Sequence, residues 1–163
     1  MDSAEPIRVL FVCAENAARS KMAEGILRAW GGDAHVAFSA GSMPGDVHPT
    51  ARAVMADWGL SLDTHRSESI AAYQGETMDY VVTLCDRTRD VSPSLRATEM
   101  VIHQPFDDPA AVPPADQRAA FEAVRDALAA WIVRVFDVVP PDDYPTTSVE
   151  AASGTVTGTA VSA

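Results

Sequence analysis

A short apolar segment near the start of the chain runs almost directly into a helical pattern. Residues 7–12 form an apolar run of strand length, and Cys13 follows at once. Residues 18–30 repeat apolar side chains at helical spacing. The apolar residues on that helical face are Ala23, Ile26, Leu27 and Trp30. A buried strand joined to a helix by a tight loop is the first half of a β-α-β unit, which restricts the chain to the α/β class.

The same alternation continues along the chain. Further strands are predicted at 35–40, 80–84 and 99–103, and further helices at 49–58 and 116–138. Short buried strands that alternate with helices indicate a parallel sheet with right-handed crossovers over both faces. We therefore predict a three-layer α/β sandwich around a four-stranded parallel sheet in the order 2-1-3-4.

The longest predicted helix carries one apolar stripe. Its members are Phe121, Val124, Leu128, Trp131, Ile132 and Val135. We interpret this stripe as core. The residues after it, 140–163, are rich in Pro, Ser, Thr, Gly and Ala, which is typical of a disordered tail. The 163 residues are thus expected to form one domain over 1–139 and a disordered tail over 140–163.

Composition limits the partners and the compartment. The formal net charge of −11 argues against nucleic acid or an anionic membrane as the main partner. No apolar run approaches the roughly 20 residues that span a bilayer, and the first residues do not resemble a signal peptide. Two cysteines are too few for a disulfide scaffold. We expect a cytoplasmic protein.

Both cysteines follow predicted strands. Cys13 comes after the first strand and Cys85 after the third. In the order 2-1-3-4 these strands are neighbours at the switch point, where open α/β sheets bind ligands beyond the carboxyl ends of their strands. Both thiols are therefore expected on the same rim of the sheet.

The loop after Cys13 is suited to bind an anion. Backbone amides at a strand-to-helix junction, together with the helix dipole, form an anion cradle that also favours a thiolate. The planar guanidinium of Arg19 can bind two oxygens of a tetrahedral anion, and Ser20 can donate a hydrogen bond to the thiolate. The predicted oxyanion-binding residues are Ala14, Glu15, Asn16, Ala17, Ala18 and Arg19. This constellation favours attack by Cys13 on a bound tetrahedral oxyanion.

Simpler explanations exist for each of these residues. A strand-end cysteine is often just a small buried apolar residue, and this reading stays open for Cys85. Asp107 and Asp108 can be an acidic turn before Pro109. The four histidines are scattered and none is paired with a cysteine at metal-ligand spacing, so we expect no structural zinc site.

The segment VLFVCAENAARSKMAEGIL resembles the phosphate-binding loop of the low-molecular-weight protein tyrosine phosphatases and of the arsenate reductases that share their fold. The resemblance continues through FSAG, HPTARAVMADWGL, DYVVTLCD and PFDDPA, and covers about residues 7–138. It implies the phosphotyrosine phosphatase I-like fold, a four-stranded parallel sheet flanked by helices. Within the superfamily, VVTLC followed by FDDPA is more similar to the thiol-coupled arsenate reductases.

The resemblance also implies roles for single residues. Cys13 matches the nucleophile, Arg19 the oxyanion-binding arginine and Ser20 the partner of the thiolate. Asp108 matches the general acid, and Cys85 matches the second redox cysteine of the reductases. A further set falls where some reductases hold a potassium ion, with Glu68 in place of an aspartate. That set is Asn16, Glu24, Ser39 and Glu68.

Three departures from the family pattern shape the expected reaction. Ser92 stands where three-cysteine reductases have a further cysteine, which removes an internal shuttle to thioredoxin. Ala110 and Ala111 follow Pro109 where the phosphatases usually carry aromatic residues, which removes a platform for an aryl ring. The acid Glu15 is unexpected in an anion loop, and we expect its side chain to point to solvent.

The resulting expectation is an arsenate reductase. Cys13 forms a thiol–arsenate adduct, and Cys85 or an external thiol resolves it and releases arsenite. No bound cofactor is expected, and the electrons come from glutaredoxin, thioredoxin or a low-molecular-weight thiol. The alternatives are a low-molecular-weight phosphatase with a phospho-cysteine intermediate, and a non-enzymatic redox or oxyanion sensor. A pure sensor has no need for an acid such as Asp108.

Overall fold

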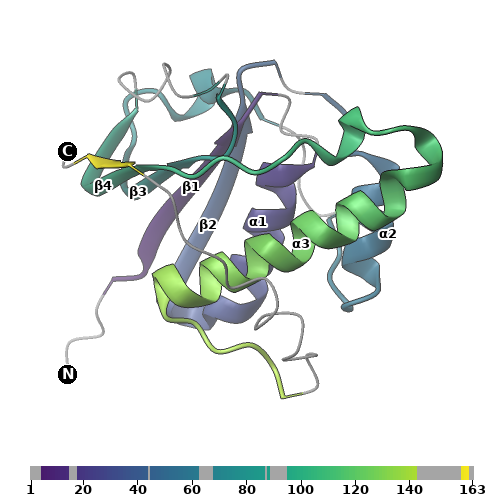
Figure 1. The fold of residues 1–163 in the computed structure, drawn as a ribbon. Coiled ribbons are helices and arrows are strands. Elements are labelled where there is room, and N and C mark those ends of the chain that lie inside the picture. The colour runs from purple at the N-terminus through teal and green to yellow at the C-terminus, as the bar shows by residue number, and fades with distance from the viewer. Residues whose placement is uncertain are drawn as a thin grey trace.

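A computed structural model describes residues 5–14, 18–43, 45–62, 68–86, 88 and 95–142, together with the backbone of 159–161. Its centre is a sheet in the order β2-β1-β3-β4-β5 (Figure 1). The parallel strands are β1 (Ile7–Cys13), β2 (His35–Gly41), β3 (Thr77–Thr83) and β4 (Arg96–His103). The predicted parallel order 2-1-3-4 is confirmed.

A fifth strand comes from the C-terminal segment. β5 (Thr159–Val161) pairs antiparallel with the far end of β4, and His103 lies opposite Thr159. Most of the segment 140–163 lies outside the described residues, so disorder there stays a prediction. The three residues of β5 extend the sheet beyond the four predicted strands.

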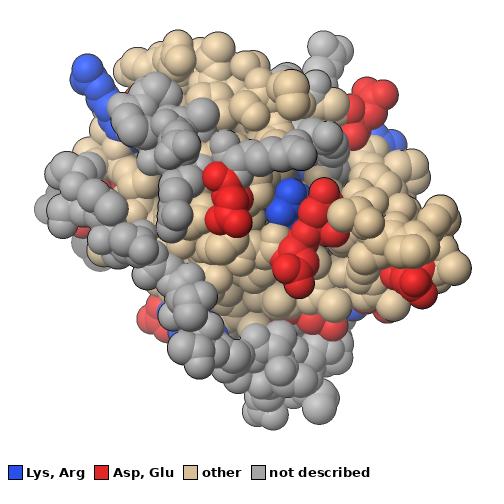
Figure 2. All heavy atoms as spheres, turned by 45° about the horizontal axis from the view of Figure 1, so that its top comes forward, with Lys and Arg blue, Asp and Glu red and all other residues tan. Residues whose placement is uncertain are grey.

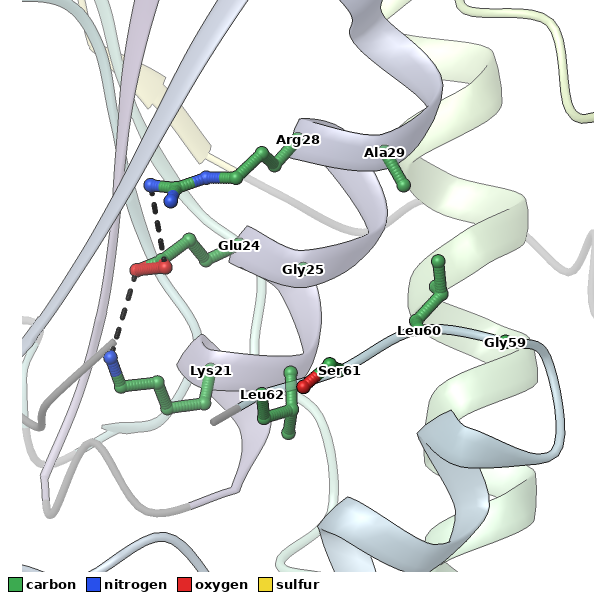
Figure 3. A pocket seen from close by; sticks show the side chains of 9 residues that line it. All are labelled: Lys21, Glu24, Gly25, Arg28, Ala29, Gly59, Leu60, Ser61 and Leu62. Atoms are coloured by element: carbon green, nitrogen blue, oxygen red, sulfur yellow. Dashed lines mark ion pairs between the residues drawn. The ribbon is translucent and has the colours of Figure 1, made fainter. Parts of the chain in front are cut away.

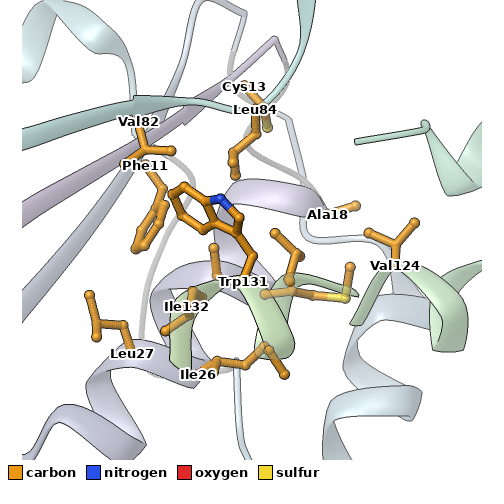
Figure 4. Packing of buried hydrophobic residues seen from close by; sticks show 14 of the residues in the cluster. Phe11, Cys13, Ala18, Ile26, Leu27, Val82, Leu84, Val124, Trp131 and Ile132 are labelled. Atoms are coloured by element: carbon orange, nitrogen blue, oxygen red, sulfur yellow. The ribbon is translucent and has the colours of Figure 1, made fainter. Parts of the chain in front are cut away.

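Three helices cover one face of the sheet (Figure 1). They are α1 (Arg19–Gly31), α2 (Pro49–Ala56) and α3 (Pro114–Phe136). Phe11 and Val82 of the sheet pack with Ile26, Leu27 and Trp131 of these helices in one buried cluster (Figure 4). Every second residue of a strand points to the same face, so β1 presents Val9, Phe11 and Cys13 to this helical layer.

The opposite face has a thinner cover. Leu10 and Val12 of β1 point there and pack with Val81 of β3. The covering residues come from the 3₁₀ turn η2 (Ile70–Tyr73). Because both faces are covered, the central strands are apolar on both sides, which explains the near-continuous apolar run in the first strand.

Two details differ from the sequence expectations. Val135 was expected in the core stripe of α3, but its side chain is 36% exposed, and Phe136 is buried in its place at 7%. At the last turn of α3, the residue that faces the core is one position later in the chain than the predicted stripe. α2 ends at Ala56 rather than at residue 58, and a turn closes at Gly59, whose φ of 73° lies in the left-handed region that glycine tolerates.

Within the described residues, no helix combines the length and the apolar character that crossing a membrane requires.

Candidate functional site

Cys13 is the last residue of β1, and its side chain is held by the first turn of α1. Its sulfur lies 2.9 Å from the Ser20 hydroxyl oxygen, and the thiol is only 3% exposed. Arg19 and Ser20 begin α1, so the positive end of the helix dipole lies beside the sulfur. The hydroxyl can donate a hydrogen bond to the sulfur, and the helix N-terminus can attract an anion to this position.

The loop between Cys13 and α1 is anchored at both ends. The Ala14 carbonyl accepts a hydrogen bond from the Met43 amide (2.8 Å) and another from the Ser42 hydroxyl (3.2 Å). At the other end, the Ala18 carbonyl accepts the Met22 amide in the first turn of α1. Three residues with predicted roles in oxyanion binding, at 15–17, lie outside the described residues. The anion cradle therefore stays a prediction, and the structure describes only the two ends of its loop.

Arg19 links this loop to the segment that carries the predicted acid. Its guanidinium Nη1 donates a 2.7 Å hydrogen bond to the Phe106 carbonyl. The Phe106 amide in turn donates to the Leu84 carbonyl at the end of β3 (3.0 Å). One nitrogen of Arg19 is thus bonded to the backbone two residues before Asp108. The guanidinium has further N–H groups that can donate to an anion.

Asp107 and Asp108 are both exposed at this end of the sheet. The Asp108 Oδ1 atom accepts the Ala110 amide (3.0 Å) and caps the short 3₁₀ helix η4 (Pro109–Ala111). With the top of Figure 1 turned forward, acidic side chains lie on both sides of a basic one (Figure 2). The described part of this face is therefore mixed in charge rather than uniformly positive.

Cys85 follows the end of β3, the neighbour of β1. Its sulfur lies 3.4 Å from the Thr88 hydroxyl oxygen, and that hydroxyl also donates to the Cys85 carbonyl (3.0 Å). The thiol is 5% exposed, and both cysteines are free. Val12 pairs with Thr83, so the two thiols follow the carboxyl ends of adjacent strands on one rim of the sheet.

A polar network beside Cys85 has no counterpart in the sequence interpretation. The buried His103 ring lies 2.7 Å from the Thr83 hydroxyl through Nδ1 and 3.1 Å from Asp86 Oδ1 through Nε2. The β3–β4 register places Thr83 beside His103. This pairing could be predicted only from the correct β3–β4 register, because Thr83 and His103 are 20 positions apart in the sequence. Among the described residues, no group of three or more His, Cys, Asp or Glu side chains could hold a metal ion.

Two of the predicted cation ligands, Glu24 and Ser39, are bonded to each other. The Ser39 hydroxyl donates a 2.5 Å hydrogen bond to Glu24 Oε1. Lys21 Nζ lies 3.9 Å from the same oxygen, an ion pair drawn in Figure 3. Arg28 Nη2 lies 3.5 Å from the other oxygen, Oε2. Burial lowers the pKa of Lys21, and the carboxylates of Glu24 and Glu68 oppose that shift. Of the other two predicted ligands, Glu68 is among the described residues and Asn16 lies outside them.

Comparison with known proteins identifies the family of this chain. The family model for low molecular weight phosphotyrosine protein phosphatases matches residues 8–133. An arsenate reductase of Halalkalibacterium halodurans is 34% identical over 122 residues, covering 74% of this chain and 88% of that protein. A glutaredoxin arsenate reductase of Synechocystis sp. is 31% identical over 102 residues, covering 63% of this chain and 78% of that protein.

The fold agrees with these sequence relatives. A solved arsenate reductase in its oxidized state superposes with a TM-score of 0.67 at 24% identity, covering 80% of this chain and 96% of that one. The matched region begins in β1 and ends in α3, so it includes Cys13, Arg19, Cys85 and Asp108. The chain therefore belongs to the low molecular weight phosphotyrosine protein phosphatase family.

Proposed function

We propose that this protein is a thiol-dependent arsenate reductase in which Cys13 is the nucleophile. The observation that carries the proposal is the contact set at the start of α1. The Cys13 sulfur lies 2.9 Å from the Ser20 hydroxyl, and Arg19 reaches the segment that carries Asp108. Relatives named arsenate reductase, 31–34% identical to this chain, support arsenate as the substrate.

The first chemical step forms a bond between sulfur and arsenic. The Cys13 thiolate attacks the arsenic of arsenate, and one oxygen leaves as water after protonation. Asp108 supplies that proton. Its Oδ1 accepts the Ala110 amide, so the proton is carried on the other carboxyl oxygen. Arg19 and the backbone amides of the loop hold the remaining oxygens and stabilise their negative charge.

The second step reduces the arsenic. A second thiolate attacks the Cys13 sulfur, a disulfide forms, and the sulfur–arsenic bond breaks with its electron pair on arsenic, which leaves as arsenite. In the intramolecular route Cys85 is the attacking thiol. In the external route a small thiol or a redox protein attacks directly. In both routes an outside thiol finally opens the disulfide, because Ser92 stands where a third cysteine would be needed.

The reducing partner follows from the same chemistry. Glutaredoxin, thioredoxin and low-molecular-weight thiols all supply the two electrons, and a relative named glutaredoxin arsenate reductase favours glutaredoxin. A reducing partner of this kind favours a cytoplasmic location for the proposed reaction. The reaction as proposed uses no bound organic cofactor.

A phosphatase is the second candidate, favoured by the family description itself. The same Cys13, Arg19 and Asp108 would form a phospho-cysteine that water hydrolyses. The two alanines after Pro109 oppose an aryl substrate, because neither can stack on an aromatic ring.

One experiment separates the two candidates. Purified protein is given arsenate with glutaredoxin, thioredoxin or a small thiol, one at a time, and arsenite is measured. In parallel it is given an aryl phosphate without reductant, and phosphate is measured. We expect arsenite with at least one thiol system and slow phosphate release. Rapid phosphotyrosine hydrolysis without any arsenite would establish the phosphatase instead.

A further inference from the structure

The single lysine of this chain is buried in the first turn of α1, one residue after the Ser20 that contacts Cys13. Lys21 follows Ser20 in the first turn of α1, and its side chain is 2% exposed. Long charged side chains normally keep their ammonium in water, because removing a charge from water is unfavourable unless an opposite charge compensates it. The burial of the Lys21 ammonium, one residue after Ser20, therefore requires a compensating negative charge.

The compensating charges are two carboxylates. Lys21 Nζ lies 3.9 Å from Glu24 Oε1, and the Glu24 side chain is itself only 5% exposed (Figure 3). Burial lowers the pKa of Lys21, whereas Glu24 and Glu68 both raise it, which places both carboxylates within electrostatic reach of the ammonium. Burial raises the pKa of the Tyr73 phenol, and the hydrogen bond that its hydroxyl donates to Glu68 raises it further.

These same carboxylates belong to the potassium site that the family resemblance implies, and the described residues do not fit a potassium ion. One oxygen of Glu24 already accepts the Ser39 hydroxyl at 2.5 Å and faces Lys21. The other oxygen faces Arg28 at 3.5 Å. A metal cation placed here would meet the buried ammonium of Lys21 and the partly exposed guanidinium of Arg28, and the repulsion from the buried ammonium is weakly screened.

We propose that the ammonium of Lys21 takes the place of a bound monovalent cation, so that this chain carries its own cation beside the anion loop. The proposal rests on the anion loop proposed above, but not on arsenate as its substrate. Lys21 is here a positioning residue, since nothing in the reaction requires it to touch the anion.

The network connects Lys21 to the loop through β2. Glu24 of α1 holds Ser39 of β2. Two residues later the Gly41 amide donates to the Glu68 carbonyl, and the Met43 amide donates to the Ala14 carbonyl, each at 2.8 Å. The Lys21 ammonium attracts the carboxylates of both Glu24 and Glu68. It therefore stabilises the packing of α1 against the end of β2, and this packing anchors the loop after Cys13.

The test removes the charge and offers a replacement from solution. Lys21→Met keeps an unbranched apolar stem and deletes the ammonium. The readouts are the melting temperature and the phosphate concentration that half-protects Cys13 from alkylation. Both are measured at equal ionic strength in potassium, methylammonium and tetramethylammonium chloride. The matched control is Arg96→Met, which makes the same charge change at the exposed amino end of β4.

We expect the unmodified protein and Arg96→Met to behave alike in all three salts. In tetramethylammonium chloride, Lys21→Met should melt roughly 6–20 °C lower, because the buried Glu24 carboxylate has lost its buried cationic partner and keeps only the partly exposed Arg28. Its half-protecting phosphate concentration should rise about tenfold through displacement of the loop. Potassium or methylammonium should recover most of both losses, because a small cation can enter the space left by the ammonium.

A double variant covers the case in which Lys21→Met does not fold. Lys21→Met/Glu24→Gln removes both charges and should fold without any dependence on the cation. Three results would overturn the proposal: potassium dependence in the unmodified protein, no effect of Lys21→Met in any salt, or equal cation dependence in the single and double variants. If phosphate fails to protect Cys13 even in the unmodified protein, the anion loop is wrong, while the melting temperatures still test the cation role.

Discussion

The two cysteines occupy similar places in the sheet and very different surroundings. Each follows the carboxyl end of a central strand, each is at most 5% exposed, and each has a hydroxyl within hydrogen-bonding distance. Cys13 is followed by a helix whose first turn supplies both Ser20 and Arg19. Cys85 is followed by a turn whose Thr88 hydroxyl donates mainly to the backbone, at 3.0 Å.

The difference predicts that the strand end alone does not make a thiol reactive. Near Cys13 a helix N-terminus and an arginine can both attract a bound anion. Next to Cys85 the described side chains are a threonine and, beyond it, the Asp86–His103 pair. A resolving thiol needs only to reach the nucleophile, so this plainer setting is compatible with the second step rather than the first.

The largest expected effect comes from removing the first thiol. Cys13→Ser should lower arsenite formation by on the order of 10³-fold or more, because no other group can form the adduct. Arsenite release by the purified variant measures this. Activity close to that of the unmodified protein would remove the distinction between the two thiols.

Asp108→Asn should come next. Loss of a general acid lowers the chemical step by roughly 10²–10⁴-fold. Single-turnover formation of the adduct measures this, while phosphate protection of Cys13 should stay almost unchanged. Asp107→Asn is the matched control on the neighbouring exposed carboxylate and should have little effect. If the two variants exchange these results, the acid is Asp107.

Cys85→Ser tests the other side of the comparison. If Cys85 resolves the adduct, the variant should still form it but release arsenite slowly. The measurement is one turnover of adduct formation followed by arsenite release with each reductant in turn. Normal turnover with a small thiol would show that the external route suffices and that Cys85 is a structural residue.

Ser20→Ala should have a smaller effect on Cys13. A hydrogen bond to a charged group contributes about 1.5–3 kcal/mol, so the variant should be alkylated at Cys13 roughly 10- to 150-fold more slowly. Alkylation rates with and without phosphate measure this. An unchanged rate would mean that the helix dipole and loop amides account for the reactivity of Cys13 without the hydroxyl.

The smallest effect is expected at the corresponding hydroxyl beside Cys85. Thr88→Val should lower the free energy of unfolding by about 1 kcal/mol, because a buried hydrogen bond to the Cys85 carbonyl is lost. The alkylation rate of Cys13 should not change. Chemical denaturation and alkylation measure the two quantities, and a slower reaction at Cys13 would show that the two thiols share one network.

Much of the fold could be predicted from periodicity. Apolar runs and helical spacing located all four parallel strands and the three helices, since burial on one or two faces leaves a direct pattern in the chain. The patterns failed at element ends. Val135 matched the stripe of α3 but is exposed, because the side that faces the core depends on what packs there, and β5 left no pattern that separated it from the rest of the tail.

The site divides in the same way. Cys13, Arg19 and Ser20 lie within eight residues, so their meeting at one strand-to-helix junction follows from local geometry that the sequence carries by itself. Other contacts join residues from different elements. They are the hydrogen bond from Arg19 to the Phe106 carbonyl, the pairing of Thr83 with His103, and the Lys21–Glu24–Ser39 cluster. Those contacts required the sheet register and the packing of α1 on β2. Only the tertiary structure decides such contacts, because their geometry depends on how separate elements pack rather than on spacing along the chain.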